Sequence, residues 1–140
     1  MSERVAIVTG AGGELGRATA EKLAAAGFTV VGVDRSEERL KELPDGIRRE
    51  AGDSADPAAA RSVVGRIAAE VGPPEVLVNT IGMYHLGDAL SATPEDFRLM
   101  MDVNVGSALW LTQAVAPYMR ERGSGSIVHV GGHANQGILR

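Results

Sequence analysis

Along the chain, short apolar runs alternate with longer segments in which apolar residues recur every three or four positions. Three runs are apolar almost throughout, which is typical of strands covered on both faces: Val5–Thr9, Thr29–Asp34 and Glu75–Thr80. Weaker strands are expected at Ile47–Asp53 and Ser126–Val130, and the former suits the edge of a sheet.

Helices are predicted between these strands, at Glu14–Ala26, at Ser36–Leu43, from Pro57 to Val71, and from Thr93 to about Arg120. The first is expected to bury the side that carries Leu15, Ala18, Leu23 and Ala26. The third has the most regular amphipathic pattern, which comprises Ala60, Val63, Val64, Ile67, Ala68 and Val71. Asp56 and Thr93 are the expected N-caps, because each precedes a proline at a first helical position.

Strands that alternate with helices imply a parallel sheet with right-handed crossovers. The predicted architecture is a doubly wound, three-layer α/β (Rossmann) fold with about five strands in the order 3-2-1-4-5. No internal repeat, low-complexity tract or linker divides the sequence, so residues 1–140 are expected to form a single domain.

Composition narrows the function classes. Hydrophobic residues make up 44% of the 140 residues and charged residues 23%, the balance of an ordinary globular protein. The net charge of −4 argues against a general nucleic-acid surface. The absence of cysteine excludes disulfides, thiolate metal sites and cysteine nucleophiles, and no metal site is expected. No apolar run reaches membrane-spanning length and the N-terminus is no signal peptide, so a soluble, cytoplasmic protein without a membrane partner is predicted.

The segment TGAGGELG, Thr9–Gly16, joins the first strand to the first helix and predicts a phosphate-binding loop. Gly10 allows a tight turn, Gly12 and Gly13 let backbone N–H groups approach an anion, and Gly16 lets the helix pack closely on the strand. Glu14 and Leu15 complete the loop at the helix N-terminus, whose partial positive charge favours a pyrophosphate. The Gly-Lys-Ser/Thr of a nucleoside-triphosphatase loop is absent.

Asp34 ends the second strand, and a carboxylate there can accept hydrogen bonds from the ribose hydroxyls of an adenosine. It would repel a 2′-phosphate, so NAD is the expected cofactor and NADP the less favoured one. The neighbouring Arg35 works against this preference, because a guanidinium can hold that phosphate.

Together these features resemble the cofactor-binding part of the short-chain dehydrogenase/reductase family over nearly the whole chain. The resemblance implies that Asp53 and Ser54 contact the adenine, and that LVNTIG supplies Asn79, Ile81 and Gly82 to the cofactor border. VNVGSALWLTQA resembles the long interface helix of the family, and its Asn104 matches the asparagine of a catalytic proton relay. GSIVHVGG resembles the strand that leads to the catalytic serine.

The sequence departs from the family pattern at several positions. Glu14 stands where the commonest branch has glycine, although Gly10, Gly13 and Gly16 fit the TGxxGxxG spacing of other branches. The family's Asn-Asn-Ala-Gly is replaced by NTIG, with Thr80 as its second residue.

The catalytic groups of the family are missing. The serine aligns with Gly132, and the only tyrosines, Tyr84 and Tyr118, have Asp88 and Arg122 where a Tyr-x-x-x-Lys motif needs lysine. The resemblance places that motif beyond Arg140, so the chain is expected to be truncated after the fifth strand. The histidines are weak substitutes for these groups. His129 is expected to be packed or hydrogen-bonded within a strand, and His85 and Tyr84 to lie in a loop without a catalytic role. Only His133 lies near the position of the missing serine, and one histidine without a paired carboxylate is not a mechanism.

Two functions lead, and a third, a cofactor-sensing regulator of the family's atypical branch, is less favoured. The favoured one is an NAD(P)-binding, dehydrogenase-like protein that is not catalytically competent as these 140 residues. The alternative is an NAD-dependent oxidoreductase acting on alcohols or ketones, seen as a shortened chain or completed by a missing C-terminal half. In either case the helix at 94–121 is apolar on more than one side, so a homo-oligomer formed through it is expected.

Overall fold

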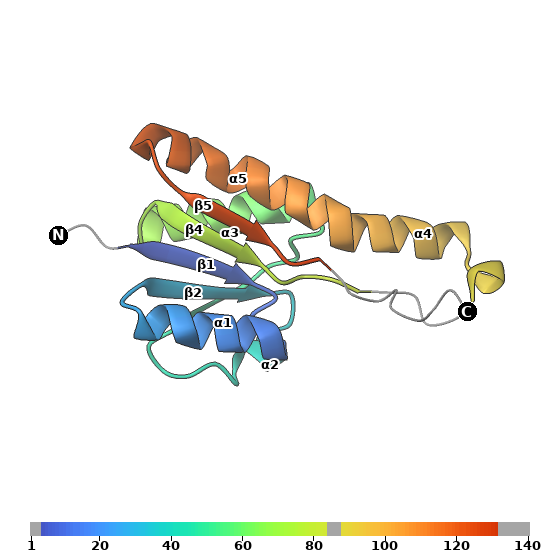
Figure 1. The fold of residues 1–140 in the computed structure, drawn as a ribbon, viewed down its shortest axis with the longest axis horizontal. Coiled ribbons are helices and arrows are strands. Elements are labelled where there is room, and N and C mark those ends of the chain that lie inside the picture. Colours follow the sequence, from blue (N-terminus) through green and yellow to red (C-terminus); the bar gives the residue numbers. More distant parts are fainter. Residues whose placement is uncertain (1–3, 84–87, 132–140) are drawn as a thin grey trace.

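The computed structural model describes residues 4–83 and 88–131, which form a five-stranded parallel sheet with helices on both faces (Figure 1). The elements are β1 (Val5–Thr9), α1 (Glu14–Ala25), β2 (Thr29–Asp34), α2 (Glu37–Leu40), β3 (Arg48–Ala51), α3 (Pro57–Glu70), β4 (Pro74–Asn79), a 3₁₀ turn η1 (Ala89–Ser91), α4 (Pro94–Met100), a π-helical segment η2 (Met101–Gly106), α5 (Ser107–Arg122) and β5 (Ser126–His129). The strand order is β3-β2-β1-β4-β5, which confirms the predicted topology and places β3 at an edge.

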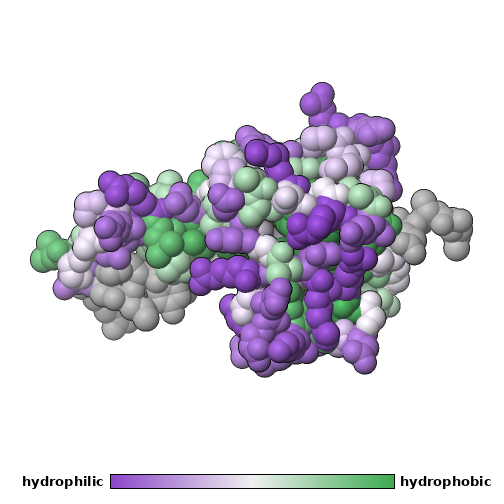
Figure 2. All heavy atoms as spheres, turned by 180° about the vertical axis from the view of Figure 1, so that it is seen from behind, coloured by the Kyte–Doolittle hydropathy of each residue, from purple (hydrophilic) through white to green (hydrophobic). Residues whose placement is uncertain are grey.

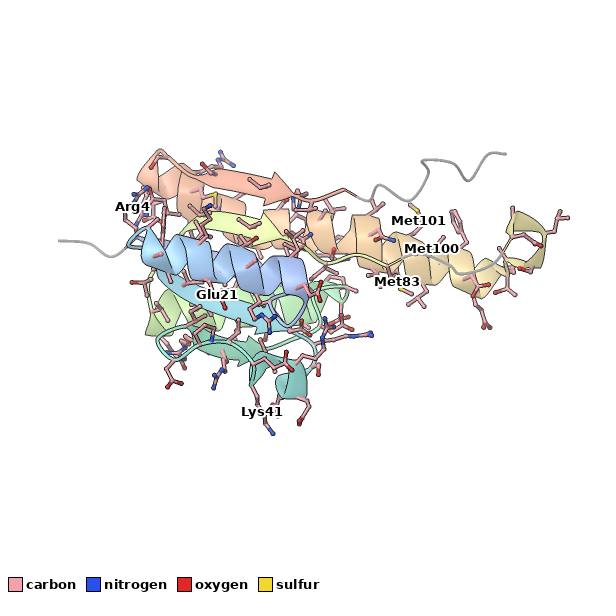
Figure 3. All side chains as sticks on the ribbon, turned by 60° about the horizontal axis from the view of Figure 1, so that its bottom comes forward. Arg4, Glu21, Lys41, Met83, Met100 and Met101 are labelled. Carbon is pink, nitrogen blue, oxygen red and sulfur yellow. The ribbon has the colours of Figure 1, made fainter. Side chains whose placement is uncertain are left out.

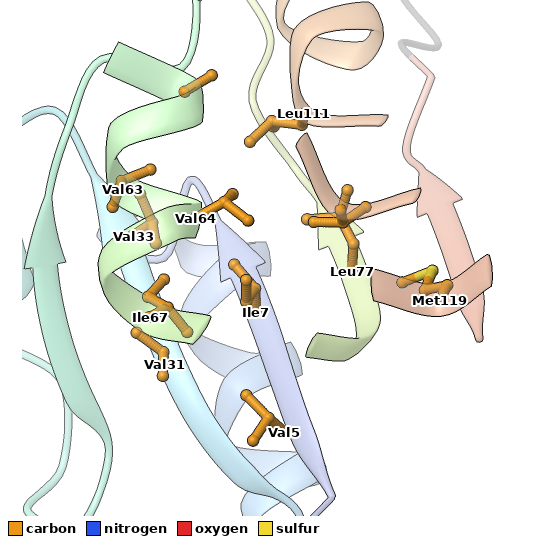
Figure 4. Close-up of a cluster of buried hydrophobic side chains, with 12 residues drawn as sticks. Val5, Ile7, Val31, Val33, Val63, Val64, Ile67, Leu77, Leu111 and Met119 are labelled. Carbon is orange, nitrogen blue, oxygen red and sulfur yellow. The ribbon is translucent and has the colours of Figure 1, made fainter. Parts of the chain in front are cut away.

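Two apolar layers lie on the two faces of the sheet. In the larger one, side chains of α3 and α5 pack against inward-facing residues of β1, β2 and β4 (Figure 4). Ile7, Ile67 and Leu77 are fully buried in it. The smaller layer lies under α1 and α2, where Ala20 and Leu40 meet the opposite faces of β1 and β2. The strand residues are therefore apolar on both sides, which explains their continuous rather than alternating pattern.

Helix α3 forms as its sequence predicts. The Asp56 side chain accepts a hydrogen bond of 2.9 Å from the backbone N–H of Ala59, and Pro57 occupies the first turn. The face that carries Ala60, Val63, Val64 and Ile67 is buried. At the C-terminal end, the N–H groups of Val71 and Gly72 both donate to the carbonyl of Ile67.

Helix α1 turns to the sheet a face that shares only Leu23 with the predicted one, since Leu23 packs against the core while Ala26 is exposed. Leu15 is 54% exposed and Ala18 is also exposed, whereas Gly16 and Ala20 are buried. The reason is the close approach of this helix to the glycine loop, because only residues with little or no side chain fit between helix and strand. Size, rather than hydrophobicity, therefore decides which side of α1 faces inward.

Three elements differ in extent from the prediction. α2 is a single turn, Glu37–Leu40, and the expected strand at Ile47–Asp53 is ordered as a strand only over Arg48–Ala51. The latter pairs with β2 over four residue pairs, which sets its length. Between β4 and α4 lies the short turn η1, in which the Asp88 side chain accepts the N–H of Ser91 at 2.9 Å.

The long helix at 94–121 is helical throughout but not uniform. α4 begins with a reciprocal capping box between Thr93 and Asp96, and α5 ends at Gly123 in the left-handed conformation (φ +81°). Between them, η2 widens into a π-helical segment, which the sequence pattern does not reveal. In the described part of the chain, no helix is long and apolar enough to cross a membrane.

Candidate functional site

The carboxyl ends of the strands meet at one edge of the sheet, where the chain winds away from β1 in two directions. Thr9 pairs in register with Asn79 of β4, which in turn pairs with His129 of β5. In open parallel sheets, ligands bind in the crevice at this switch point. A cleft of about 340 Å³ lies here.

Most of the residues predicted to bind a cofactor line this cleft: Gly10, Gly13, Glu14, Leu15, Gly16, Asp34, Arg35, Asp53, Ser54, Ile81 and Gly82. Three other predicted residues, Gly12, Asn79 and Asn104, are not part of the lining. The lining also includes residues that sequence reasoning did not select: Arg39, Gly52, Ala55, Thr80, Met83 and Val103.

The glycine loop is shaped by close backbone contacts. Gly10 has φ +74°, in the left-handed region, and its carbonyl accepts the N–H of Gly13 at 3.0 Å. A methyl group on Gly16 would lie 2.1 Å from the Gly10 carbonyl oxygen, so glycine is required for α1 to start here. Because Gly13 is the N-cap, no side chain caps the first turn of α1, and its N–H groups are available to an anion.

The carboxylate of Asp34 is hydrogen-bonded to the backbone of the glycine loop. It is 5% exposed, and its two oxygens accept N–H groups from Gly12 at 2.9 Å and from Ser36 at 3.0 Å. A methyl group on Gly12 would lie 2.8 Å from the nearer carboxylate oxygen, so the missing side chain of Gly12 admits the acid. A carboxylate has about four acceptor positions, so Asp34 retains capacity for a ligand hydroxyl.

Asp53 and Ser54 follow β3 on the adjoining wall. One oxygen of Asp53 accepts the N–H of Ala55 at 3.0 Å, which fixes the turn. The hydroxyl of Ser54 is buried and has no hydrogen-bond partner among the described residues. A buried hydroxyl without a partner is unusual, and here it belongs to a residue of the cleft wall.

Asn79 ties the ends of the central strands together. Its side-chain oxygen accepts the hydroxyl of Thr9 at 2.9 Å and the N–H of Ile81 at 3.0 Å. Its amide nitrogen therefore donates, to Ser107 Oγ at 3.4 Å and to Nδ1 of His129 at 3.3 Å. The predicted Asn79 is thus buried and holds together residues next to the cleft, with Ile81 in its lining.

His129 is held in one neutral tautomer by this arrangement. Nδ1 accepts from Asn79, so the ring proton is on Nε2, which lies 2.9 Å from the hydroxyl of Thr112. Although the residue is largely exposed, partial burial of its ring lowers the pKa of His129 below the usual value. Its hydrogen bonds agree with the expectation of a packed or hydrogen-bonded histidine through the second alternative, since the residue is exposed.

Thr80 replaces the second asparagine of the family's Asn-Asn-Ala-Gly and serves the glycine loop directly. Its hydroxyl donates to the carbonyl of Thr9 at 2.8 Å and contacts that of Gly10 at 3.3 Å. The side chain therefore locks the end of β4 to the start of the loop. The replacement of the family's second asparagine by Thr80 therefore has a structural role of its own.

Asn104 projects from the π-helical segment and binds the backbone of Met83 at two points. Its oxygen accepts the N–H at 2.9 Å and its nitrogen donates to the carbonyl at 2.7 Å. Figure 3 shows Met83 beside the helical segment that carries Met100 and Met101. The side chain thus anchors the loop after β4 to η2, and both of its polar atoms are engaged.

Several candidates named from the sequence lie outside the described residues: Tyr84, His85, Gly132 and His133. Of the wall residues that the sequence reasoning missed, Thr80 and Met83 directly adjoin predicted ones. Arg39 had no such signal, because its place at the cleft depends on how α2 packs.

Comparisons with known proteins agree with this geometry. The family model for short chain dehydrogenase matches residues 4–137. A short chain dehydrogenase of Pseudocercospora fijiensis is 39% identical over 137 residues, covering 91% of this chain and 44% of that protein. The 2,3-dihydro-2,3-dihydroxybenzoate dehydrogenase of Bacillus subtilis is 33% identical over 138 residues, covering 94% and 53%.

Among solved structures, a short-chain dehydrogenase from Streptomyces avermitilis superposes with a TM-score of 0.85 at 38% identity. The match covers 92% of this chain and 49% of that one. The chain therefore spans about half the length of the curated relatives that it matches.

Proposed function

This chain belongs to the short-chain dehydrogenase family, and on that premise we propose that its cleft binds NAD. The observation that carries the proposal is the position of the Asp34 carboxylate, bonded to the glycine loop at the N-terminus of α1. A ribose beside this carboxylate and a pyrophosphate at the helix N-terminus are neighbouring parts of one dinucleotide.

The residues present fit such a ligand. The first turn of α1 offers N–H groups without a side-chain cap, and a side chain at Gly16 would collide with the loop backbone. Asp34 would accept hydrogen bonds from the ribose hydroxyls. The unpartnered hydroxyl of Ser54, with Asp53 beside it, would face the adenine. Ile81 and Gly82 would border the nicotinamide side of the cleft. When bound, NAD would supply a hydride acceptor.

We further propose that these 140 residues do not transfer hydride by themselves. Hydride transfer to a carbonyl needs a general acid with a lowered pKa, which acts as the general base when an alcohol is oxidised, and a cation to lower that pKa. Neither Tyr84 nor Tyr118 has a lysine four residues later, and Gly132 replaces the family's serine. Asn104 matches the relay asparagine, and both of its side-chain polar atoms are hydrogen-bonded to the backbone of Met83.

A complete oxidoreductase is the second candidate, because β5 leaves apolar side chains exposed at the sheet edge. Val128 is 49% exposed and Val130, just after the strand, 42%. In the relatives, about half of the length lies outside the matched part. A C-terminal half supplied to this edge would cover it and could bring the missing acid and cation.

A homo-oligomer through the α4–α5 region is also proposed. Large apolar side chains on this region are exposed, namely Phe97, Leu99, Met101, Val105 and Leu109. Figure 2 shows hydrophobic surface toward the end of the molecule where α4 lies. Several large apolar side chains exposed on one helical region are typical of a subunit contact. Sedimentation of the purified chain tests this proposal.

The cofactor assignment is tested by titrating the chain with NADH and following nicotinamide fluorescence. Asp34→Ala should weaken NADH binding at least tenfold and reduce the preference over NADPH. Asp45→Ala, an exposed aspartate in a turn, is the matched control and should bind like the wild type. Unfolding curves of both variants show whether each is folded. Unchanged affinities for both cofactors in folded Asp34→Ala would overturn the assignment.

Turnover separates the two candidate functions. NADH oxidation with a panel of ketones should remain at the background rate for this chain alone, even when binding is saturated. Sustained turnover would instead establish a complete oxidoreductase.

A further inference from the structure

His129 ends the edge strand β5, and its imidazole joins three elements of the fold. It is paired in register with Asn79 of β4, and its Nδ1 lies 3.3 Å from the side-chain nitrogen of Asn79. On the other side of the ring, Nε2 lies 2.9 Å from the hydroxyl of Thr112 in α5. The imidazole therefore connects an exposed strand end to the buried residue that holds Ile81 in the cleft wall.

The orientation of the Asn79 amide is fixed by its other partners. The backbone N–H of Ile81 can only donate, so the side-chain oxygen of Asn79 faces it at 3.0 Å. The hydroxyl of Ser107 donates to the carbonyl of Val103 at 2.6 Å, which leaves its oxygen to accept from the Asn79 nitrogen at 3.4 Å. The amide nitrogen therefore faces His129 as a donor, and Nδ1 of His129 can accept only while it carries no proton.

A proton on Nδ1 would disrupt this arrangement. Nδ1–H and the amide of Asn79 would both be donors, facing each other across 3.3 Å. If the amide turned over to offer its oxygen to the ring, its nitrogen would face the N–H of Ile81 instead. Asn79 and Ser107 are both buried, so a polar group left without a partner there is destabilising. Protonation therefore either detaches the imidazole from Asn79 or transfers the conflict to Ile81 at the cleft.

In residues 4–83 and 88–131, no charged side chain is bonded to the imidazole, since its partners Asn79 and Thr112 are neutral. The titratable residues of the elements around it lie near the start of β4, near the end of α5 or exposed on η2, namely Glu75, Tyr118, Arg120, Glu121, Arg122 and Asp102. Glu75 is engaged by Arg4 and Arg122, each at 3.3 Å. Partial burial, which lowers the pKa of His129, is thus not offset by a bonded carboxylate.

We propose that His129 is a positioning residue for the cleft: by accepting from Asn79 it keeps Ile81 in place, and its protonation weakens dinucleotide binding. The inference rests on the proposed function, because its ligand is the dinucleotide of that site. The neutral imidazole supports the tight-binding form of the cleft. Because the pKa of His129 in the folded chain lies below the usual 6.5, affinity should be constant in neutral solution and fall as the pH drops below that value.

Calorimetric titration with NAD at constant ionic strength measures this dependence. The wild type should bind NAD about fivefold more weakly at about pH 5.5 than at about pH 8. NAD is stable in mild acid and its pyrophosphate stays ionised, so the ligand itself does not change. Unfolding curves at both pH values show whether each protein is folded.

Two variants isolate the acceptor on residue 129, and both lose the bond to Thr112. His129→Asn places an amide oxygen two bonds beyond Cβ, where the imidazole has Nδ1, and this oxygen accepts at every pH. It should bind NAD as the wild type does at high pH and change less than about twofold on acidification. His129→Leu has no acceptor and should bind at both pH values as weakly as the acidified wild type. The cleft carboxylates Glu14, Asp34 and Asp53 are common to all three proteins, so the comparison removes their contribution.

The outcomes distinguish the role of His129 from the dinucleotide site itself. Equal pH profiles for the wild type and His129→Asn would overturn the inference, because another group would then carry the dependence. A His129→Leu protein that loses stability but keeps its affinity for NAD would show that His129 is only structural. Wild-type binding that is the same at both pH values would leave the site standing and refute the positioning role. If NAD binds at neither pH, the proposed function fails and the positioning role fails with it.

Discussion

The requirement for glycine at position 16 gives the sharpest test of how the cleft is built. In Gly16→Ala the new methyl group would lie 2.1 Å from the carbonyl oxygen of Gly10 and 2.9 Å from Cα of Ala11. Both atoms belong to the backbone, so no side chain can rotate away. The start of α1 must instead move off the loop by roughly 1 Å, the difference from an ordinary van der Waals contact.

Overpacking of this kind lowers the free energy of unfolding by about 1–3 kcal/mol. The better helix propensity of alanine offsets at most about 1 kcal/mol of that loss. Gly16→Ala should therefore lose about 1–2 kcal/mol of unfolding free energy. The same substitution at Gly65 is the matched control, because a methyl group there meets nothing within 4 Å. Gly65 lies inside α3, so Gly65→Ala should gain about 0.5–1 kcal/mol.

Urea unfolding, followed by the fluorescence of Trp110, the only tryptophan, measures both variants. NADH titration of the folded variants adds a functional readout, and Gly16→Ala should bind weakly while Gly65→Ala binds normally. The reasoning is refuted if the two alanines shift stability by the same amount, or if Gly16→Ala keeps full affinity for NADH.

Two further predictions concern buried or partly buried polar groups. The lowered pKa of His129 means that the unfolded chain takes up its proton first, so acidification should cost stability as the pH falls through about 6.5, the usual histidine value. His129→Gln should lose less stability over the same range, and parallel pH profiles would contradict this. The unpartnered Ser54 hydroxyl predicts that Ser54→Ala leaves unfolding unchanged or stabilises by about 1 kcal/mol, and a marked loss of stability would reveal a bond to that hydroxyl.

The topology could be predicted because its signals are local. Continuous apolar runs mark buried strands, the Asp56–Pro57 cap marks α3, and the regular spacing of its apolar residues marks its buried face. The face of α1 was predicted correctly only at Leu23, because hydrophobicity pointed to Leu15 while contact distance selected Gly16. The π-helical segment η2 was not foreseen, since the bonds of Asn104 to Met83 join parts of the chain far apart in sequence.

By itself, then, the sequence determined the order of strands and helices, and it predicted a phosphate-binding loop at TGAGGELG. It also shows that residues 1–140 contain no Tyr-x-x-x-Lys motif. These depend on residue types and short spacings. Only the tertiary structure decided that Asp34 is bonded to Gly12, that Asn79 joins Thr9 to His129, and that Arg39 lies over Gly13. Each of these contacts joins different elements, and their distances are set by how helices pack on the sheet, which no local pattern encodes.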